Sequence, residues 1–369
     1  MKVLVTGAKG FVGKNLCLAL SRIEGVEIFK FDLGNTGEEL AQWLGECDFV
    51  FHLAGVNRPK DENEFATGNT VFTEDLLAML ESRPVPILLS SSIQAACDNP
   101  YGKSKLAAED AVRADGKKTG AKVFVYRLAN VFGKWCRPNY NSAVATWCHN
   151  RARGLDITVR DRAAQVNLVY IDDVADAFVG CMNGEIAPSE TYLSVEPCYA
   201  KSLGEVVDLI ESFRNEPETL DVPDQKDGFS KKLYATFLSY LPEDSFSYPL
   251  EMHCDDRGSF TEMLHTSERG QVSVNISKPG IVKGQHWHHT KHEKFLVVSG
   301  TGVIRFRKID EDAAETVSYE VSGDKLEVVR VPPGYTHNIE NTGTTDMVTV
   351  MWANEVFNPA KPDTFFEKV

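Results

Sequence analysis

Two groups of reactive side chains lie far apart in this sequence of 369 residues. In the first, Tyr101 and Lys105 are spaced so that they share one face of a helix, one turn apart. We expect Asn99 to cap that helix and Pro100 to be its first residue. A nearby ammonium stabilises a phenolate and lowers the pKa of the phenol. The pattern therefore predicts Tyr101 as a proton donor at neutral pH, with Ser92 bonded to the same substrate oxygen.

The second group consists of histidines and a carboxylate near the end of the chain. His286 and His288 are two residues apart, so on a strand they point to the same face. With Glu293 and His337 they form a set suited to Zn, Mn, Fe or Ni. We predict a divalent metal site with zinc as the expected ion. The alternative is a histidine cluster satisfied by hydrogen bonds inside a barrel.

The elements that must position the first group begin at the N-terminus. Residues 2–6 are an apolar run, which is followed by a glycine-rich turn and an apolar-periodic segment that ends at Leu20. Glycines in a strand-to-helix turn let the backbone approach a pyrophosphate, and the helix N-terminus offers free amides. The expected cofactor contacts are Gly7, Lys9, Gly10, Phe11, Val12 and Gly13, then Leu53, Ala54 and Gly55 after a later strand, and Tyr101 and Lys105.

The order of glycine turn, Ser92, Tyr101 and Lys105 resembles the extended short-chain dehydrogenase/reductase family, whose nucleotide-sugar members carry Ser/Thr, Tyr and Lys in this arrangement. The resemblance implies a Rossmann-type doubly wound parallel sheet. The stretch 127–133 resembles the family's Arg-x-x-Asn-Val-Tyr-Gly turn, and the segment between Ser92 and Tyr101 is shorter than in typical relatives. The resemblance also implies substrate contacts, for which the candidates are Asn130, Asn139, Arg160 and Arg162, with one of the arginines facing a diphosphate.

Two alignments lead to different nicotinamide cofactors. In the first, the second strand spans residues 26–30, and Asp32 and Leu33 resemble a later element that the family places beside the adenine. Lys30, together with Lys9, then meets a 2′-phosphate, which favours NADPH. In the second alignment, Asp32 is the acid that bonds the ribose 2′-hydroxyl, which favours NAD. We expect NADPH.

The character of the chain changes after residues 241–249, an apparent linker. Alternating apolar residues and glycine turns predict a small antiparallel barrel, and residues 247–369 resemble both cupin motifs, although Leu326 replaces the usual glycine of the second. The region also resembles the sugar-nucleotide 3,5-epimerases. That resemblance implies His286 as a catalytic base, Lys283 in place of an arginine, and Lys294 as the catalytic lysine. Whether His286 is a base or a metal ligand stays open.

Length and composition set the remaining limits. The length favours two domains, which we place at residues 1–243 and 247–369, giving an α/β plus all-β chain with a jelly-roll β-barrel. The net charge of −14 argues against nucleic-acid binding. The eight cysteines show no C-x-x-C spacing, which suits reduced thiols. The N-terminus is typical of a strand and not of a signal peptide. No apolar run is long enough to cross a membrane. We expect a cytoplasmic protein.

The two modules can act on one ketone. A 4-keto sugar has an acidic C3 proton and accepts hydride at C4, so epimerisation must precede reduction. The whole chain resembles the family of capsular polysaccharide synthesis enzymes that includes CapF. The resemblance implies a UDP-2-acetamido-2,6-dideoxy-L-4-hexulose, epimerised and reduced to UDP-2-acetamido-2,6-dideoxy-L-talose, the precursor of UDP-N-acetyl-L-fucosamine, and a homodimer. The alternatives are a reductase with a non-catalytic cupin, and a sugar-nucleotide sensor.

Overall fold

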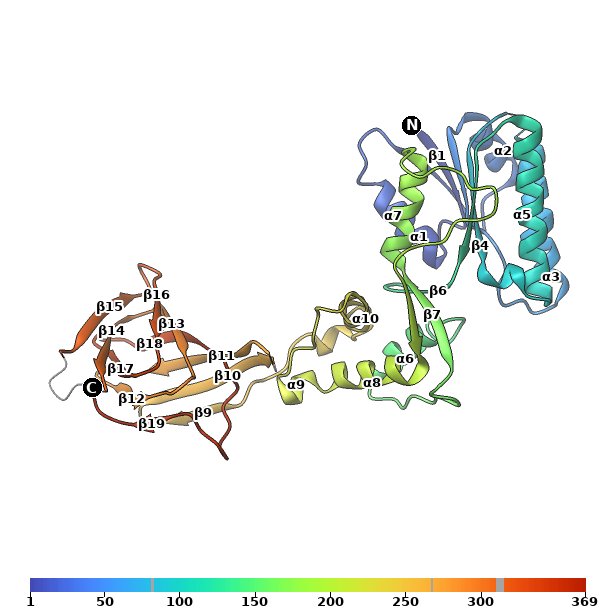
Figure 1. Cartoon of the computed structure of the whole chain (residues 1–369). Coiled ribbons are helices and arrows are strands. Elements are labelled where there is room, and N and C mark those ends of the chain that lie inside the picture. The colour runs from blue at the N-terminus through green and yellow to red at the C-terminus, as the bar shows by residue number, and fades with distance from the viewer. Residues whose placement is uncertain (81–82, 267, 310–314) are drawn as a thin grey trace. The chain divides into compact units, whose positions relative to one another are not determined.

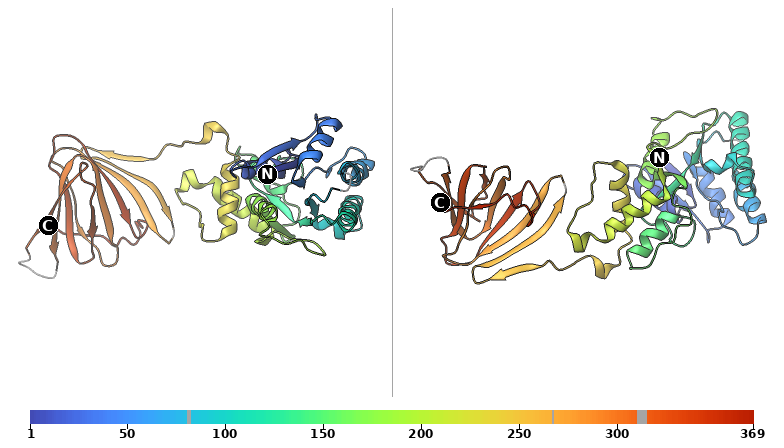
Figure 2. Two further views of the ribbon diagram at one scale, coloured as in Figure 1. Left: turned by 90° about the horizontal axis from the view of Figure 1, so that it is seen from above. Right: turned by 60° about the horizontal axis from the view of Figure 1, so that its bottom comes forward.

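The computed structural model describes residues 1–80, 83–266, 268–309 and 315–369. The chain forms two compact units (Figures 1 and 2). Unit 1 contains Met1–Glu211 and Lys226–Pro242, and unit 2 contains Ser212–Gln225 and Glu243–Val369. The segment 212–225 therefore joins the second unit, whereas the sequence pattern assigned it to the first.

Unit 1 is built on a five-stranded parallel sheet with the strand order β2-β1-β3-β4-β5. Short apolar runs form these strands because a parallel sheet is buried on both faces. The strands are β1 (Lys2–Thr6), β2 (Glu27–Phe31), β3 (Phe49–His52), β4 (Ile87–Ser92) and β5 (Val123–Leu128). The doubly wound arrangement expected from the sequence is confirmed.

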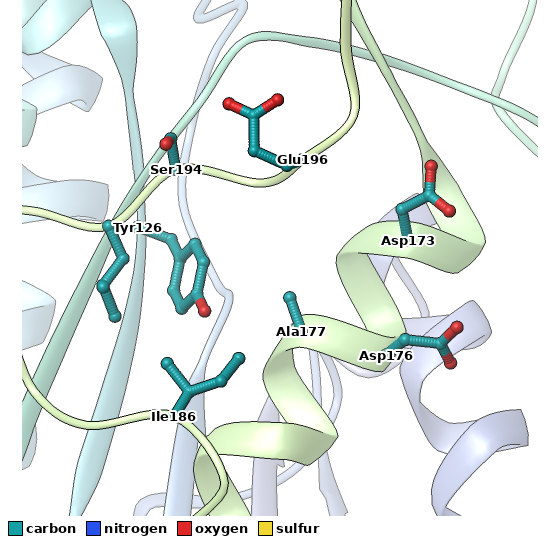
Figure 3. A pocket seen from close by; sticks show the side chains of 8 residues that line it. Tyr126, Asp173, Asp176, Ala177, Ile186, Ser194 and Glu196 are labelled. Atoms are coloured by element: carbon teal, nitrogen blue, oxygen red, sulfur yellow. The ribbon is translucent and has the colours of Figure 1, made fainter. Parts of the chain in front are cut away.

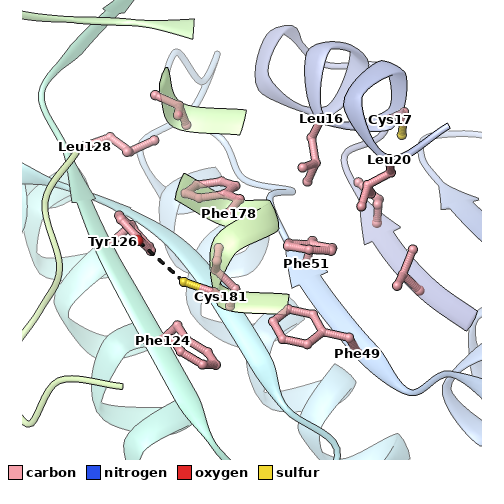
Figure 4. Close-up of a cluster of buried hydrophobic side chains, with 14 of the residues drawn as sticks. Leu16, Cys17, Leu20, Phe49, Phe51, Phe124, Tyr126, Leu128, Phe178 and Cys181 are labelled. Atoms are coloured by element: carbon pink, nitrogen blue, oxygen red, sulfur yellow. Dashed lines mark hydrogen bonds between the residues drawn. The ribbon is translucent and has the colours of Figure 1, made fainter. Parts of the chain in front are cut away.

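Helices cover both faces of this sheet (Figure 1). On one face lie α1 (Phe11–Leu20) and α7 (Ile171–Met182), and on the other lie α2 (Gly37–Glu46), α4 (Phe72–Met79) and α5 (Pro100–Thr119). Figure 4 shows the core beneath α1 and α7, where the rings of Phe51, Tyr126 and Phe178 are fully enclosed. This packing fixes the strand ends that carry the candidate site.

The rest of unit 1 includes a three-stranded sheet with the order β6-β7-β8. Its strands are β6 (Asn130–Phe132), β7 (Gln165–Tyr170) and β8 (Cys198–Ser202), and the remaining helical elements before unit 2 resumes are α3 (Asn63–Phe65), the π-helix η1 (Ala66–Val71), the 3-10 helix η2 (Ile93–Ala96), α6 (Ala143–Arg151), α8 (Leu203–Arg214), α9 (Glu216–Thr219) and α10 (Gly228–Leu238). Leu193 adds an isolated parallel bridge to Tyr126.

Unit 2 contains two antiparallel sheets with the orders β16-β13-β18-β11-β10-β9 and β15-β14-β17-β12-β19. Phe295 and Val297 of the first sheet share a buried core with Ile304 and Ile339 of the second. The elements are η3 (Glu243–Ser245), β9 (Met252–Asp255), β10 (Gly258–Thr266), β11 (Gly270–Ser277), β12 (Val282–Trp287), β13 (Glu293–Ser299), β14 (Thr301–Lys308), β15 (Val317–Ser322), β16 (Val328–Val331), β17 (Tyr335–Asn341), β18 (Met347–Ala353) and β19 (Phe365–Phe366). The expected all-β C-terminal part is confirmed.

None of the helices in the described ranges combines the length and the apolar character that crossing a membrane would require.

Candidate functional site

The start of α5 carries Tyr101 and Lys105 as the sequence predicts. Asn99 caps the helix, since its side-chain oxygen accepts the backbone N–H of Gly102 at 2.8 Å, and Pro100 is the first helical residue. Ser92 ends β4, and its hydroxyl accepts the backbone N–H of Gln94 at the start of η2. A strand end and a helix start thus bring Ser92 to the phenol of Tyr101, which it hydrogen-bonds.

Burial sets the charge states of this pair. Lys105 is 7% exposed and donates from Nζ to the carbonyl of Ser90 at 3.0 Å. Burial lowers the pKa of Lys105 to about 8, although Glu109 opposes that shift. Burial also raises the pKa of Tyr101, and the hydrogen bond with Ser92 offsets this only in part. The expected lowering of the Tyr101 pKa is therefore wrong for the isolated chain, because desolvation outweighs other influences on the phenol.

Sequence reasoning missed a buried polar residue beside this pair. Asn69 is 2% exposed, accepts the backbone N–H of Val56 at 2.8 Å, and donates to the carbonyl of Val56 and to the hydroxyl of Ser104. It lies in the π-helix η1, an irregularity that often marks a functional site. A Cβ on Gly55 would lie 2.7 Å from Asn69 Oδ1 and 3.0 Å from Lys105 Nζ. Asn69 thus joins the loop after β3 to α5.

A second buried connection involves His52, at the end of β3. Its Nδ1 lies 2.8 Å from the hydroxyl of Thr6, and its Nε2 lies 2.9 Å from the hydroxyl of Thr73, which donates to the carbonyl of Asn69. Complete burial lowers the pKa of His52 to about 3. His52 is therefore a neutral structural link between β1, β3 and α4.

The carboxylate of Glu109, one turn after Lys105 on α5, holds two neighbouring strands. It accepts the hydroxyl of Ser91 at 2.5 Å and a two-pronged ion pair from Arg127 of β5, with the shortest nitrogen–oxygen distance 2.8 Å. Ser91 lies directly before Ser92. This buried contact therefore helps to fix Ser92 relative to the helix that carries Tyr101 and Lys105.

The glycine turn has the shape that a pyrophosphate requires. Gly7 has φ +68°, and a Cβ on Gly13 would lie 2.1 Å from the carbonyl oxygen of Gly7. Gly10 is the N-cap of α1 and has no side chain to occupy the first amides of the helix. Phe11 and Val12 form its first turn, and the amides of Leu53 and Ala54 bond the Thr6 hydroxyl close by. The turn fits a nicotinamide dinucleotide.

Asp32 lies next to the glycine turn, at the position where the adenosine of a dinucleotide is expected. Strand β2 ends at Phe31, one residue later than expected, so Asp32 directly follows it. The carboxylate of Asp32 accepts the backbone N–H of Lys9 at 2.6 Å and that of Leu33 at 2.8 Å. Lys30 lies within β2 and is exposed. Lys9 is therefore held next to Asp32, the residue expected beside the ribose. Lys30 lies two residues before Asp32 in the sequence.

The expected substrate residues of unit 1 have separate environments. The side-chain amide of Asn130 donates to the carbonyl of Asn167, and Asn139 adopts φ +55°. Arg160 is exposed in a loop, while Arg162 pairs with Asp208 at 2.6 Å. Arg160 is thus the better placed of the two arginines for an anionic ligand.

A pocket of about 440 Å³ in unit 1 lies apart from these residues. Figure 3 shows the carboxylates of Asp173, Asp176 and Glu196 around its rim and Tyr126 in its wall. None of the predicted catalytic residues lines it.

In unit 2, His286, His288, Glu293 and His337 come together as predicted, and their candidate ligand atoms all lie within 4.8 Å of one another. In the described parts of the chain, His288 Nε2, Glu293 Oε2 and His337 Nε2 are buried and have no hydrogen-bond partner. Such atoms cost free energy unless something bridges them. Three imidazoles and a carboxylate fit zinc or a related divalent ion. His288 Nε2 and His337 Nε2 lie 3.6 and 3.4 Å from Glu293 Oε2, which are distances that a cluster held by its own contacts would also show.

The surroundings of this cluster also suit a metal. His288 Nδ1 contacts the carbonyl oxygen of Asp363, which leaves Nε2 for a ligand bond. The carboxylate of Asp363 accepts the backbone amides of His289, Thr290 and Lys291. These amides, although opposed by desolvation, hold the pKa of Asp363 far below its usual range.

Lys294, expected as a catalytic lysine, does not belong to this cluster. Side chains alternate along a strand, and on β13 Glu293 is buried while Lys294 is exposed and lies over the ring of Trp352. The structure therefore places Lys294 outside the cluster, and its catalytic role stays a prediction. Lys291 is the lysine at the cluster, with Nζ 3.2 Å from the second oxygen of Glu293.

Lys283 lies on the same strand as His286 but is held by other groups. Its Nζ donates to the side-chain oxygen of Asn275 at 2.7 Å and to the carbonyl of Ile276 at 2.8 Å. Burial lowers its pKa. These contacts join β12 to β11 across the two sheets.

Comparisons with known proteins match both units. Residues 3–192 match the model of the NAD dependent epimerase/dehydratase family, and residues 253–365 match that of the polysaccharide biosynthesis C-terminal domain. The crystal structure of the capsular polysaccharide assembling protein CapF from Staphylococcus aureus is 51% identical, covers 100% of both chains, and has a TM-score of 0.94.

A UDP-2-acetamido-2,6-beta-L-arabino-hexul-4-ose reductase from Pseudomonas aeruginosa is 47% identical over 99% of this chain and 98% of its own. A UDP-glucuronic acid 4-epimerase from Bacillus cereus, in complex with NAD, is 20% identical over 57% of this chain and 83% of its own, with a TM-score of 0.53. The last likeness concerns the fold alone.

Proposed function

Because the chain belongs to the NAD dependent epimerase/dehydratase family and is related over its whole length to CapF, we propose that it inverts C3 and then reduces C4 of a UDP-linked 4-keto-6-deoxy amino sugar. The proposed substrate is UDP-2-acetamido-2,6-dideoxy-L-4-hexulose, and the product is UDP-2-acetamido-2,6-dideoxy-L-talose, a precursor for UDP-N-acetyl-L-fucosamine and capsule synthesis. The name of the Pseudomonas aeruginosa relative supports the reductive half.

The observation that carries the reductive half is the placement of Ser92, Tyr101 and Lys105 around the end of β4. The bound nicotinamide would supply the hydride. Tyr101, whose raised pKa keeps its proton in place, donates that proton to the C4 oxygen as the alcohol forms. Ser92 bonds the same oxygen, and the Lys105 ammonium lies on the cofactor side, beside Gly55.

For the cofactor we propose NADPH. An NAD site would use Asp32 to bond the ribose hydroxyls. Each oxygen of Asp32 accepts one backbone amide and keeps a further lone pair, so the proposal is supported by the nearby lysines and not by Asp32. Lys9 and Lys30 supply positive charge near the position of a 2′-phosphate. The expected result is a higher kcat/KM with NADPH than with NADH, and a loss of that preference in Lys9→Ala. A wild-type preference for NADH would contradict the proposal.

The epimerising half is proposed for the cupin-like unit 2. His288, Glu293 and His337, all buried, would hold the metal, which would stabilise negative charge near the substrate. His286 is the least buried of the four residues, so we assign it as the base that removes the C3 proton. On this assignment, His286→Ala retains zinc by elemental analysis, whereas His288→Ala loses it.

We also propose that unit 2 forms a homodimer. One outward face of its larger sheet is apolar, because Val274, Val350 and Leu296 lie side by side across three strands and are only partly buried. An apolar sheet face of this kind is stabilised when a second copy covers it.

One experiment tests the two halves together. Wild-type protein is incubated in heavy water with the keto sugar nucleotide and no NADPH, and deuterium at C3 is followed by NMR. We expect incorporation, which His286→Ala abolishes. Incorporation that survives His286→Ala would overturn the assignment of the base.

The second candidate is a reductase whose β domain is not catalytic, which the reductase name of the relative favours. It predicts no deuterium at C3 with the wild-type protein, while NADPH consumption remains normal with a substrate that is already epimerised. The same assay therefore separates the two functions.

A further inference from the structure

We propose that His265, supported by Glu262, is a second proton-transfer residue in unit 2 and acts on the face of the sugar opposite His286. The inference rests on the proposed C3 epimerisation. Inversion requires that a proton leave C3 on one face and return on the other, which two groups on opposite sides achieve. The residues described so far supply only one side.

A bulge in β10 places this pair. Residues three apart on a regular strand point to opposite faces. The pairing of β10 with β11 shifts between Glu262 and Leu264, so Glu262 and His265 point to the same face. His265 Nδ1 lies 2.6 Å from Glu262 Oε1, and the side chains are 22% and 29% exposed. Bulges often re-aim side chains next to active sites.

The shared face is the inner one. Residues directly opposite each other on antiparallel strands share a face. His265 pairs with Gln271, Gln271 with Ala353, and Ala353 with Glu293. The histidine therefore lies in one row with the carboxylate of the metal cluster, three strand spacings or ~14 Å away. Between them lie Gln271, whose side-chain oxygen accepts the backbone N–H of Phe357, and Ala353, which contributes only a methyl group.

The two imidazoles come from different sheets. His265 lies on β10 of the larger sheet, while His286 lies on β12 of the smaller one. The sheets enclose a common core in which Phe295 meets Ile339. The proposal requires the sugar ring to bind between the cluster and β10, with His286 on one side and His265 on the other.

The backbone of His265 is held from both sides. Its N–H donates to the carbonyl of Leu220 at 2.8 Å, and its carbonyl accepts the N–H of Val222 at 2.9 Å. β11 pairs with the other edge. A proton-transfer group held in this way keeps its geometry through the reaction.

The proposed step needs no redox reagent. The C3–H bond breaks as His286 takes the proton, and the electron pair moves into the enolate of the C4 carbonyl. Protonated His265 then gives its Nε2 proton to C3 from the opposite face, while the Glu262 carboxylate supports the positive ring. Both histidines regain their starting states by exchange with water.

The test uses full-length His265→Asn in heavy water without NADPH, with NMR of both C3 epimers. We expect deuterium to enter the recovered substrate at C3 through His286, while formation of the inverted epimer falls on the order of 100-fold or more. Glu262→Gln should slow inversion in the same direction. The exposed His253 of β9 supplies the matched control, His253→Asn, with unchanged inversion.

Reduction of an already epimerised substrate by NADPH shows that unit 1 of each variant is folded, and a wild-type zinc content by elemental analysis shows the same for unit 2. Inversion at the wild-type rate in His265→Asn would overturn the assignment, and so would an equal loss of exchange and inversion with reduction intact. Absence of exchange in the wild-type protein would instead refute the proposed epimerase itself.

Discussion

At the residue scale, Tyr101 and Lys105 lie one helical turn apart, yet burial moves their pKa values in opposite directions. The phenol keeps its proton more firmly, and the ammonium loses its proton more readily. Both shifts favour the neutral form of each side chain. Tyr101 therefore keeps the proton that reduction requires at neutral pH. Lys105 loses its proton, and with it the positive charge, at alkaline pH.

This charge balance predicts the pH dependence of reduction. Because the pKa of Lys105 is about 8, kcat for NADPH oxidation should fall as the pH rises above about 8. Tyr101→Phe should lower kcat on the order of 100-fold or more at every pH and spare C3 exchange. Steady-state kinetics from pH 6 to 10 check both points, and a flat profile above pH 8 would count against the role of Lys105.

His52 allows a stability prediction at the same scale. Its folded-state pKa of about 3 lies below the ordinary value of 6.5, so the unfolded chain binds the extra proton between these values. The contribution of neutral His52 to the free energy of unfolding is therefore fully present above pH 6.5 and is lost as the pH falls toward 3. From pH 7 to 5, the free energy of unfolding should drop by roughly 2 kcal/mol more in the wild type than in His52→Gln. Urea unfolding at both pH values measures the difference, and equal drops would contradict it.

At the scale of elements, the turn between β1 and α1 depends on the absence of side chains. A Cβ at Gly13 would enter the carbonyl of Gly7, so Gly13→Ala should raise the Kd for NADPH at least about tenfold, measured by fluorescence titration. Gly45→Ala in α2 is the matched control, since nothing lies within 4 Å of its Cβ. It should leave binding unchanged and stabilise the helix by up to ~1 kcal/mol. Equal affinities in both variants would refute the argument.

Local rules predicted some elements from the sequence and could not predict others. The cap at Asn99 and the first turn of α5 depend on neighbouring residues, and the structure has both. The roles of Lys294 and Lys291 depend on where β13 begins, which is set by pairing with β18. The π-helix that holds Asn69 has no periodic signature. The bulge between Glu262 and Leu264 follows from strand register, which only the assembled sheet defines.

At the scale of the whole molecule, the apolar face around Val274 predicts association between copies. Val274→Lys should convert a dimer into a monomer, as measured by analytical ultracentrifugation. Val317→Lys on β15, which lies in the other sheet and is 48% exposed, should leave the mass unchanged. A wild-type protein that sediments as a monomer would refute the proposed dimer.

The excursion of residues 212–225 into unit 2 has an evolutionary consequence. The backbone passes between the units after residues 211, 225 and 242, and residues 220–222 complete the edge of β10. A single recombination event near residue 242 would therefore separate β10 from residues 220–222, which complete its edge. Exchange of unit 1 or unit 2 between relatives would therefore succeed only if residues 212–225 were transferred together with the C-terminal barrel.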